Sequence, residues 1–195
     1  MQAARGTSLS HDDSSLNDSR SVPSRARVRA LLYGVFALLY VVDQGTKWLA
    51  VDRLADQVEK RLVGDLLVLH LTRNAGAAFS TGTGYTQLFT LLAIAAALTV
   101  VWLSFRVGSA WWAVAFGLLL AGICGNLTDR LVRSPGFLQG HVVDFLELPH
   151  WPIFNVADIC IDVAAVMILV QAFRGIRLDG SRAARGTDQP GASDS

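Results

Sequence analysis

The chain has 195 residues, 52% of them hydrophobic, and a mean hydropathy of +0.39. This apolar composition excludes an ordinary soluble domain and predicts a small protein that crosses a membrane several times. The formal net charge is only +1, and no basic motif is recognisable, so nucleic-acid binding is not expected. Cys124 and Cys160 lie in apolar runs, outside any cluster with metal-ligand spacing. The sequence therefore predicts neither a metal site nor a cofactor.

The two ends of the chain are polar and differ from its apolar middle. Residues 1–24 are rich in Ser, Asp and Arg and contain almost no large apolar side chain. They are expected to be a disordered extension rather than a secretory signal peptide. The final stretch is similarly polar. The sequence thus divides into a disordered cytoplasmic extension (1–24), a membrane domain (25–176) and a disordered cytoplasmic tail (177–195).

Four apolar runs can each cross a bilayer, since a transmembrane helix needs about 20 residues. Four spans would put both termini on the same side of the membrane. That side carries more Arg close to the helix ends, so the positive-inside rule places both termini in the cytoplasm. The predicted spans cover residues 30–50, 87–105, 111–128 and 153–173.

The segments between these spans include two that are long enough to fold outside the membrane. Residues 51–86 contain short apolar runs separated by Gly, which predicts strands and turns. Residues 131–152 contain the sequence HVVDFL, which predicts a short strand. Under the four-span topology both segments lie on the outer side.

Polar side chains gather at the outer ends of the predicted spans, and such clustering in apolar helices indicates a site. Asp43 and Lys47 lie four residues apart and are predicted to form a structural pair that ties the first span to the following loop. Asp129 is expected to form an ion pair with Arg130 or to anchor a helix end. The predicted cluster consists of Asp43, Lys47, Asn74, Asn126, Asp129, Arg130, Asp144, Asn155 and Asp158.

Asp144 and Asp158 are the main candidates for chemistry, because each is isolated in apolar sequence where ionisation is costly. Two carboxyls brought together share one proton. The ionised one can take a proton from a water that attacks a peptide carbonyl, and the protonated one can donate to the carbonyl oxygen. Spacing alone leaves open a second interpretation, two unrelated acids at the membrane interface. Asn155 is predicted to share a helix face with Asp158 and could orient its carboxyl.

Five sequence blocks carry a resemblance to a known family. Together they resemble lipoprotein signal peptidase, also called signal peptidase II, a bacterial membrane aspartic peptidase. The blocks occur in the order of the family and cover most of the chain from about residue 30 to residue 173. They are DQGTK (43–47), RNAGAAFS (73–80), GICGNLTDR (122–130), GHVVDF (140–145) and FNVAD (154–158).

The resemblance implies an all-α membrane protein with four transmembrane helices, a small β-cradle on the outer face and a short extramembrane helix. The substrate would be a prolipoprotein whose lipobox cysteine carries diacylglycerol, cut on the amino side of that cysteine at the bacterial inner membrane. The other partners would be membrane lipids, and nothing requires more than a monomer. Asp144 and Asp158 would be the catalytic pair. The groups that would line or support the site are Asn74, Gly122, Asn126, Arg130 and Asn155, with Asp43, Lys47 and Asp129.

Two positions depart from the pattern of the family. Ala121 stands where a glycine is common, and Asp162 stands where an uncharged residue is expected. Asp162 could be a partner of Asp158 or could face a polar seam, and the sequence leaves both open. A small transporter or proton relay would also use intramembrane acids. Such a protein should distribute polar residues through the bilayer depth, whereas here they gather at one end.

Overall fold

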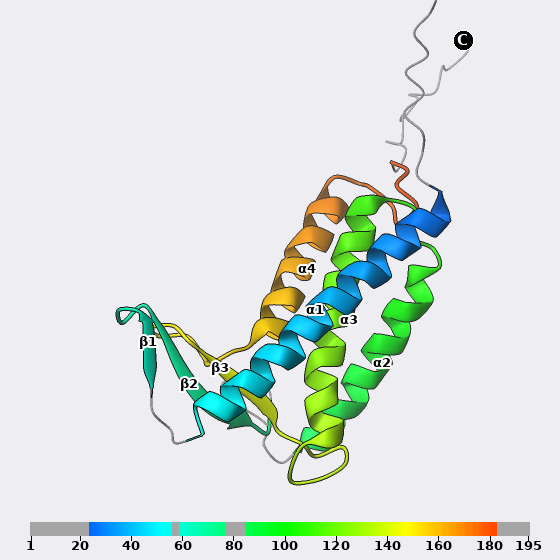
Figure 1. Ribbon diagram of the computed structural model, residues 1–195. Helices are drawn as coiled ribbons and strands as arrows, with labels where there is room; N and C mark the ends of the chain where they lie inside the picture. Colours follow the sequence, from blue (N-terminus) through cyan, green and yellow to red (C-terminus); the bar gives the residue numbers. More distant parts are fainter. Residues whose placement is uncertain (1–23, 56–58, 77–84, 183–195) are drawn as a thin grey trace, which may run out of the picture.

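The computed structural model describes residues 24–55, 59–76 and 85–182. Four helices form a bundle, and a small antiparallel sheet lies at one end of it (Figure 1). Most of the polar extension and residues 183–195 of the tail, both expected to be disordered, lie outside the described residues. The elements are α1 (Arg25–Arg53), β1 (Lys60–Val63), β2 (Leu67–Asn74), α2 (Thr86–Ser104), α3 (Ala110–Val132), β3 (Val142–Glu147) and α4 (Val156–Phe173).

Three of the helices begin at a side chain that accepts a hydrogen bond from a backbone N–H of the first turn. Ser24, Ser109 and Asn155 play this part for α1, α3 and α4, at 3.1 to 3.4 Å. Such caps satisfy N–H groups that have no partner within the helix. Helix α4 begins at Val156, later than the predicted span. Asn155 therefore precedes the helix, and the expectation that it lies on a helix face is wrong.

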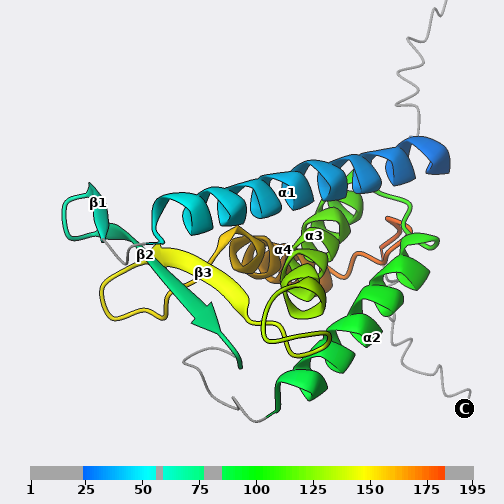
Figure 2. The same ribbon diagram turned by 60° about the horizontal axis from the view of Figure 1, so that its bottom comes forward.

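Helix α3 is the centre of the bundle, with α1, α2 and α4 packed around it (Figures 1 and 2). Small residues on α3 allow this close approach, as is usual for helices packed within membranes. A Cβ at Gly117 would lie 2.7 Å from the backbone oxygen of Leu32 in α1. A Cβ at Gly122 would overlap the backbone oxygen of Ala157 in α4. These two glycines set how near α1 and α4 come to α3.

Within the described residues, three helices are long and apolar enough to cross a membrane, namely α2, α3 and α4. They correspond to the last three predicted spans. Helix α1 has 29 residues, but the polar stretch from Asp43 to Lys47 interrupts its apolar run. Length and composition therefore support a membrane-embedded protein with three of the four expected spans.

The sheet has the strand order β1–β2–β3, and both neighbouring pairs are antiparallel. This confirms the strands predicted within residues 51–86 and at HVVDFL. Val143 and Phe145 of β3 pack against Ala50 of α1 and against Leu54, the residue that follows α1. Since successive side chains of a strand point to opposite faces, Asp144 faces away from this apolar contact. The expected short extramembrane helix is not among the elements of the described segments.

A buried ion cluster ties α1 to the rest of the bundle. The Nζ of Lys47 lies 3.0 Å from Asp43 Oδ2 and 2.9 Å from Asp129 Oδ2, and none of these side chains is more than 1% exposed. Asp43 accepts a hydrogen bond from the N–H of Ala157 at 2.9 Å, and Asp129 accepts one from the N–H of Val143 at 3.2 Å. The predicted Asp43–Lys47 pair is confirmed, but it ties α1 to α3, α4 and β3 rather than to the loop after α1.

The ion pair of Asp129 also differs from the expectation. Its partners are Lys47 and Arg133, the latter at 2.5 Å, and not Arg130. Arg133 lies four residues on, one helical turn from Asp129, whereas a neighbouring residue points to a different side of the helix. Arg130 instead donates hydrogen bonds to the backbone oxygens of Gly76 and Asn126.

Replacing Lys47 with Met should destabilise the protein strongly, because Asp43 and Asp129 would lose their shared cation while remaining buried. Breaking a buried pair in this way typically costs about 3–5 kcal/mol. Thermal unfolding in detergent micelles would measure the loss. The matched control is Lys60→Met, since Lys60 is exposed and donates to the backbone oxygen of Arg53. Equal melting temperatures for the two variants would contradict the role given to Lys47.

Candidate active site

Asp144 is held on β3 by two amides. The Nδ2 of Asn155 donates to its Oδ1 at 2.6 Å, and the Nδ2 of Asn74 donates to its Oδ2 at 3.1 Å. Asn74 is the last residue of β2, the strand paired with β3. The side-chain oxygen of Asn74 accepts from the N–H of Gly76 at 3.0 Å, which fixes the orientation of its amide. Strand pairing and a local turn thus set the position of the Asp144 carboxyl.

Asp158 lies in the first turn of α4, where it completes a reciprocal cap with Asn155. The backbone N–H of Asp158 donates to Asn155 Oδ1 at 3.1 Å, and the N–H of Asn155 donates to Asp158 Oδ2 at 3.0 Å. This arrangement satisfies two N–H groups at the start of the helix. The positive end of the helix dipole also favours negative charge at this position.

Asn126 of α3 joins the two carboxyls through Asn155. Its Nδ2 donates to Asp158 Oδ1 at 2.8 Å, and its Oδ1 accepts from Asn155 Nδ2 at 3.1 Å and from Lys47 Nζ at 2.9 Å. Because an ammonium group can only donate, Lys47 fixes which end of the Asn126 amide faces it. The NH₂ group must then face Asp158. The buried ion cluster therefore orients the amide that holds one of the two carboxyls.

Both carboxyls face a cavity of about 540 Å³ between the sheet and the end of the bundle. Its wall combines a few polar groups with many apolar ones, as is usual for a binding site. Arg130 lies on this wall, where it donates to the backbone oxygens of Gly76 at 3.2 Å and Asn126 at 3.4 Å. The lining residues are Asn74, Gly76, Asn126, Arg130, Val142, Asp144, Leu148, Trp151, Pro152, Ile153, Phe154, Asp158, Ile159 and Asp162.

The surroundings of Asp144 favour its protonated form. The pKa of this carboxyl is raised to about 7, mainly by burial and secondly by the neighbouring Asp158, against the opposing effects of Asn155, Asn74 and Lys47. The side chain is only 2% exposed. Near neutral pH the Asp144 carboxyl can therefore hold a proton.

The structure brings together most, but not all, of the residues predicted for the site. Asn74, Asn126, Arg130, Asp144, Asn155 and Asp158 meet at the cavity or directly behind it. Asp43, Lys47 and Asp129 form the buried support described above. Gly122 is not among the lining residues; its contact is with α4, so it acts in helix packing rather than in the site.

Two groups that support the site were not predicted. The backbone oxygen of Gly76 accepts a hydrogen bond from the Arg130 guanidinium group. The side-chain amide of Gln44 donates to Asp43 Oδ2 at 3.0 Å and to the backbone oxygen of Gly125 at 3.1 Å. Both residues lie inside sequence blocks that signalled the site, RNAGAAFS and DQGTK. The blocks were informative, but the individual contacts depend on the three-dimensional arrangement.

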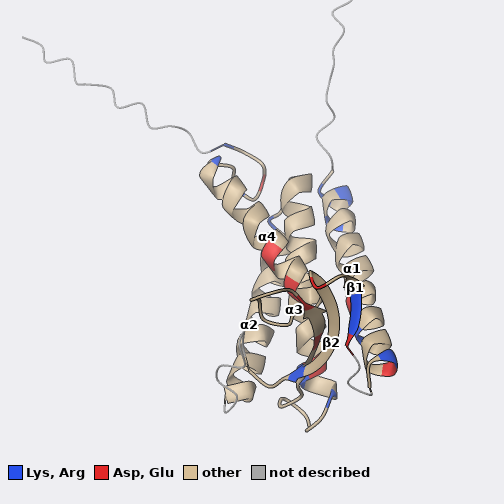
Figure 3. Ribbon diagram, turned by 90° about the vertical axis from the view of Figure 1, so that its left-hand side faces the viewer, with Lys and Arg blue, Asp and Glu red and all other residues tan. Residues whose placement is uncertain are grey.

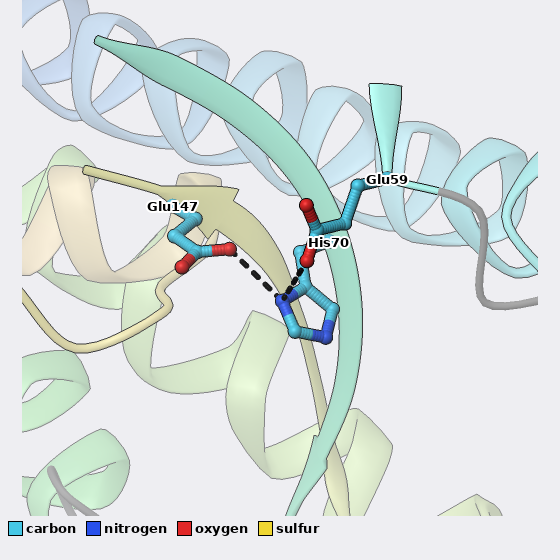
Figure 4. Close-up of side chains that lie close together, drawn as sticks. All are labelled: Glu59, His70 and Glu147. Carbon is cyan, nitrogen blue, oxygen red and sulfur yellow. Dashed lines mark hydrogen bonds and ion pairs between the residues drawn. The ribbon is translucent and has the colours of Figure 1, made fainter. Parts of the chain in front are cut away.

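A separate group of titratable side chains lies on the sheet (Figure 4). His70 Nδ1 is 2.9 Å from Glu147 Oε2 and 3.8 Å from Glu59 Oε1. Their donor atoms are close enough to hold a metal ion in principle. All three side chains are at least 38% exposed, however, and none lines the cavity. A charge-assisted hydrogen bond across neighbouring strands explains the arrangement.

Comparison with known proteins identifies the family. The sequence profile described as "Signal peptidase (SPase) II" matches residues 35–174. The chain belongs to the signal peptidase II family. Members of this family are membrane aspartic peptidases, which agrees with a cavity that presents two carboxyls beside apolar helices.

Curated relatives give the same result over most of the chain. A lipoprotein signal peptidase of Leifsonia xyli subsp. xyli is 47% identical over 165 residues, 82% of this chain and 76% of the relative. One from Rhodococcus jostii is 41% identical over 172 residues, 88% and 87% of the two chains. A lipoprotein signal peptidase of Mycobacterium tuberculosis is 39% identical over 159 residues, which are 82% of this chain and 79% of the relative.

Solved structures support the fold. Two structures titled as a bacterial membrane enzyme superpose with a TM-score of 0.66. The first is 22% identical and covers 80% of this chain and 95% of its own, and the second is 24% identical and covers 74% and 94%. The bundle with its terminal sheet is therefore an architecture already seen in bacterial membrane enzymes.

The raised pKa of Asp144 should make the stability of the protein depend on pH. Its folded-state pKa exceeds the ordinary value of 3.8, so the unfolded protein releases this proton at lower pH than the folded protein. The stabilisation present in acid is then lost as pH rises towards 7. Melting temperatures between pH 4 and pH 8 should fall for the wild type and fall less for Asp144→Asn. Asp52→Asn, at an exposed position, should keep the wild-type slope; equal slopes for all three proteins would contradict the assignment.

Proposed function

We propose that this protein is a lipoprotein signal peptidase that uses Asp144 and Asp158 to activate water. It removes the signal peptide from diacylglyceryl-modified prolipoproteins by cutting on the amino side of the modified cysteine. Family membership supports the activity. The observation that carries the residue assignment is the linked arrangement in which Asn155 and Asn126 hold both carboxyls at one cavity. The peptidase unit in this proposal is residues 25–176.

The first step uses the two carboxyls in different protonation states. Asp158, ionised at the start of α4, takes a proton from a water in the cavity as the water oxygen attacks the scissile carbonyl carbon. Asp144, protonated near neutral pH, donates its proton to the carbonyl oxygen. The product of this step is a tetrahedral diol, with the proton now on Asp158 and the negative charge on Asp144.

The second step returns the pair to its starting state. Asp158 gives its proton to the leaving amine of the modified cysteine, and Asp144 recovers a proton from a hydroxyl of the diol as the C–N bond breaks. A new carboxyl end forms on the signal peptide, and a free amine forms on the lipoprotein. Arg130, whose charge acts on both carboxyls, contributes positive potential beside the developing charge.

The placement of the chain in the membrane follows from the same arrangement. With 29 residues, α1 is about 43 Å long at 1.5 Å per residue, so it can cross the bilayer as the fourth span. Both ends of the described chain lie at the end of the bundle opposite the sheet (Figure 1). We place that end at the cytoplasm and the cavity near the outer face of the inner membrane. A lipid-modified substrate could then keep its acyl chains in the bilayer while its scissile bond reaches the pair.

The transporter or proton-relay alternative is not favoured. A relay needs polar groups at successive depths of the bilayer. The charged and amide groups described above instead meet at the sheet end of the bundle. Helix α2 is tan in Figure 3, the colour of uncharged residues. Helix α2 contains no charged residue at all.

Asp144→Asn and Asp158→Asn should each abolish processing, because each step needs both groups. A loss of at least about 10²–10⁴-fold in the cleavage rate is expected, the usual contribution of a general acid or base. The assay is the size shift of a diacylglyceryl-modified prolipoprotein incubated with purified enzyme in micelles. Asp52→Asn is the matched control and should retain wild-type turnover. The proposal fails if a correctly folded variant at either position keeps near-normal turnover.

Chelators should leave the cleavage rate unchanged, because the mechanism needs no metal and the Glu59–His70–Glu147 group does not line the cavity. The rate would be measured before and after dialysis against EDTA, with His70→Ala as a second test of that group. A metal-independent reaction would be contradicted if EDTA strongly inhibited cleavage, zinc restored it, and the His70→Ala variant had lost the cleavage activity.

A further inference from the structure

Asp162 is a charged residue of the cavity that the proposed mechanism does not use. It lies in α4, four residues beyond Asp158, and its side chain lines the cavity with Asp158 and Ile159. These two aspartates are the only charged residues of α4. Among the described residues, Asp162 has no hydrogen-bond or ion-pair partner. Its carboxyl is thus free to interact with whatever enters the cavity.

A carboxyl at this depth is rare in a membrane helix, and the Asp162 side chain is exposed where it lines the cavity. Asp162 is the seventh residue of α4, about 9 Å along the helix from its outer end, and the residues beyond it are apolar. An acid inside a membrane helix faces a partner or a water-filled cavity and commonly marks a path for a ligand. The structure provides the cavity and no protein partner in the described part of the chain. The natural partner is therefore the substrate.

The position of Asp162 along α4 indicates which part of the substrate lies beside its carboxyl. From Asp158 to Asp162 the helix rises about 6 Å towards the membrane interior. An extended peptide covers the same distance in about two residues. The signal peptide also runs from the scissile bond into the membrane, so its second or third residue before that bond lies level with Asp162. The ester groups of the lipid offer only acceptors and would not satisfy a carboxylate.

We propose that Asp162 is a specificity-determining residue that accepts a hydrogen bond from a hydroxyl side chain at the second or third residue before the cleaved bond. The inference rests on the proposed function and adds a substrate class to it, namely signal peptides with Ser or Thr at one of these positions. A hydrogen bond to a carboxylate discriminates by about ten- to hundredfold against an isostere that lacks the donor.

The test compares Thr with Val, which have nearly the same shape. Two pairs of synthetic diacylglyceryl peptides would differ only at the second or only at the third residue before the scissile bond. The value of kcat/KM would be measured for wild type and for Asp162→Val in micelles. The Val variant removes the acceptor and adds an apolar side chain that suits a membrane helix, so its folding is not at risk. Val166→Thr, one turn deeper at an exposed position outside the cavity lining, is the matched control.

The expected result is a preference of tenfold or more for Thr over Val in one pair, in wild type and in Val166→Thr, that falls towards one in Asp162→Val. The proposal is overturned if wild type shows no preference in either pair, or if the preference survives in Asp162→Val. Failure of the proposed function looks different, because wild type would then cleave neither member of any pair. That result would remove the basis of this inference as well.

Discussion

The rest of the structure depends on the three polar contacts of the Lys47 ammonium group. It reaches Asp43 within α1, Asp129 on α3 and the side-chain oxygen of Asn126. Each of the two acids also accepts a hydrogen bond from a backbone N–H group. Asp43 is bonded in this way to the start of α4, and Asp129 to β3. One buried cation thus positions both elements that carry the proposed catalytic carboxyls. The arrangement also explains how a full charge can be tolerated there, since all three donor hydrogens of the ammonium group have acceptors.

The groups next to the carboxyls are mainly neutral amides, and this choice has a chemical reason. Asn74, Asn126 and Asn155 hold the two acids in place without bringing a formal charge against them. A cation bonded directly to Asp144 would stabilise its ionised form and remove the proton that the proposed reaction needs. Lys47 acts on the pair through Asn126, and Arg130 is held by two backbone oxygens. The positive charge is therefore near the pair without being bonded to either acid.

The sequence was sufficient to predict features that depend on local composition and on short motifs. Three apolar spans, the strands and the cluster of polar residues at one end follow from hydropathy and from the blocks around Asn74, Asn126, Asp144 and Asp158. What could not be predicted were contacts that depend on how separate helices meet. One partner of Asp129 is Lys47, 82 positions earlier in the chain, and no local pattern favours Lys47 over the adjacent Arg130.

Gly122 and Asn155 illustrate the same limit. A glycine near a functional block can serve either a cavity or a helix contact, and only the distance to Ala157 shows that Gly122 serves the contact. Asn155 was expected on a helix face, but as the residue before the helix its amide can reach Asp144 while its backbone contacts Asp158. The start of α4 at Val156, three residues later than the predicted span, leaves Asn155 outside the helix and able to bridge the two acids.

The order of the elements along the chain has a consequence for how the enzyme is made. Asp158 and its cap belong to α4, the last helix of the bundle, whereas Lys47, Asn126 and Asp144 are synthesised earlier. Until α4 inserts beside α3, Asp144 lacks the Asn155 amide and Asp43 lacks the N–H of Ala157. A nascent chain that lacks α4 therefore holds only one of the two proposed catalytic carboxyls. Under the proposed mechanism, the pair is complete only once the last helix of the bundle has been added.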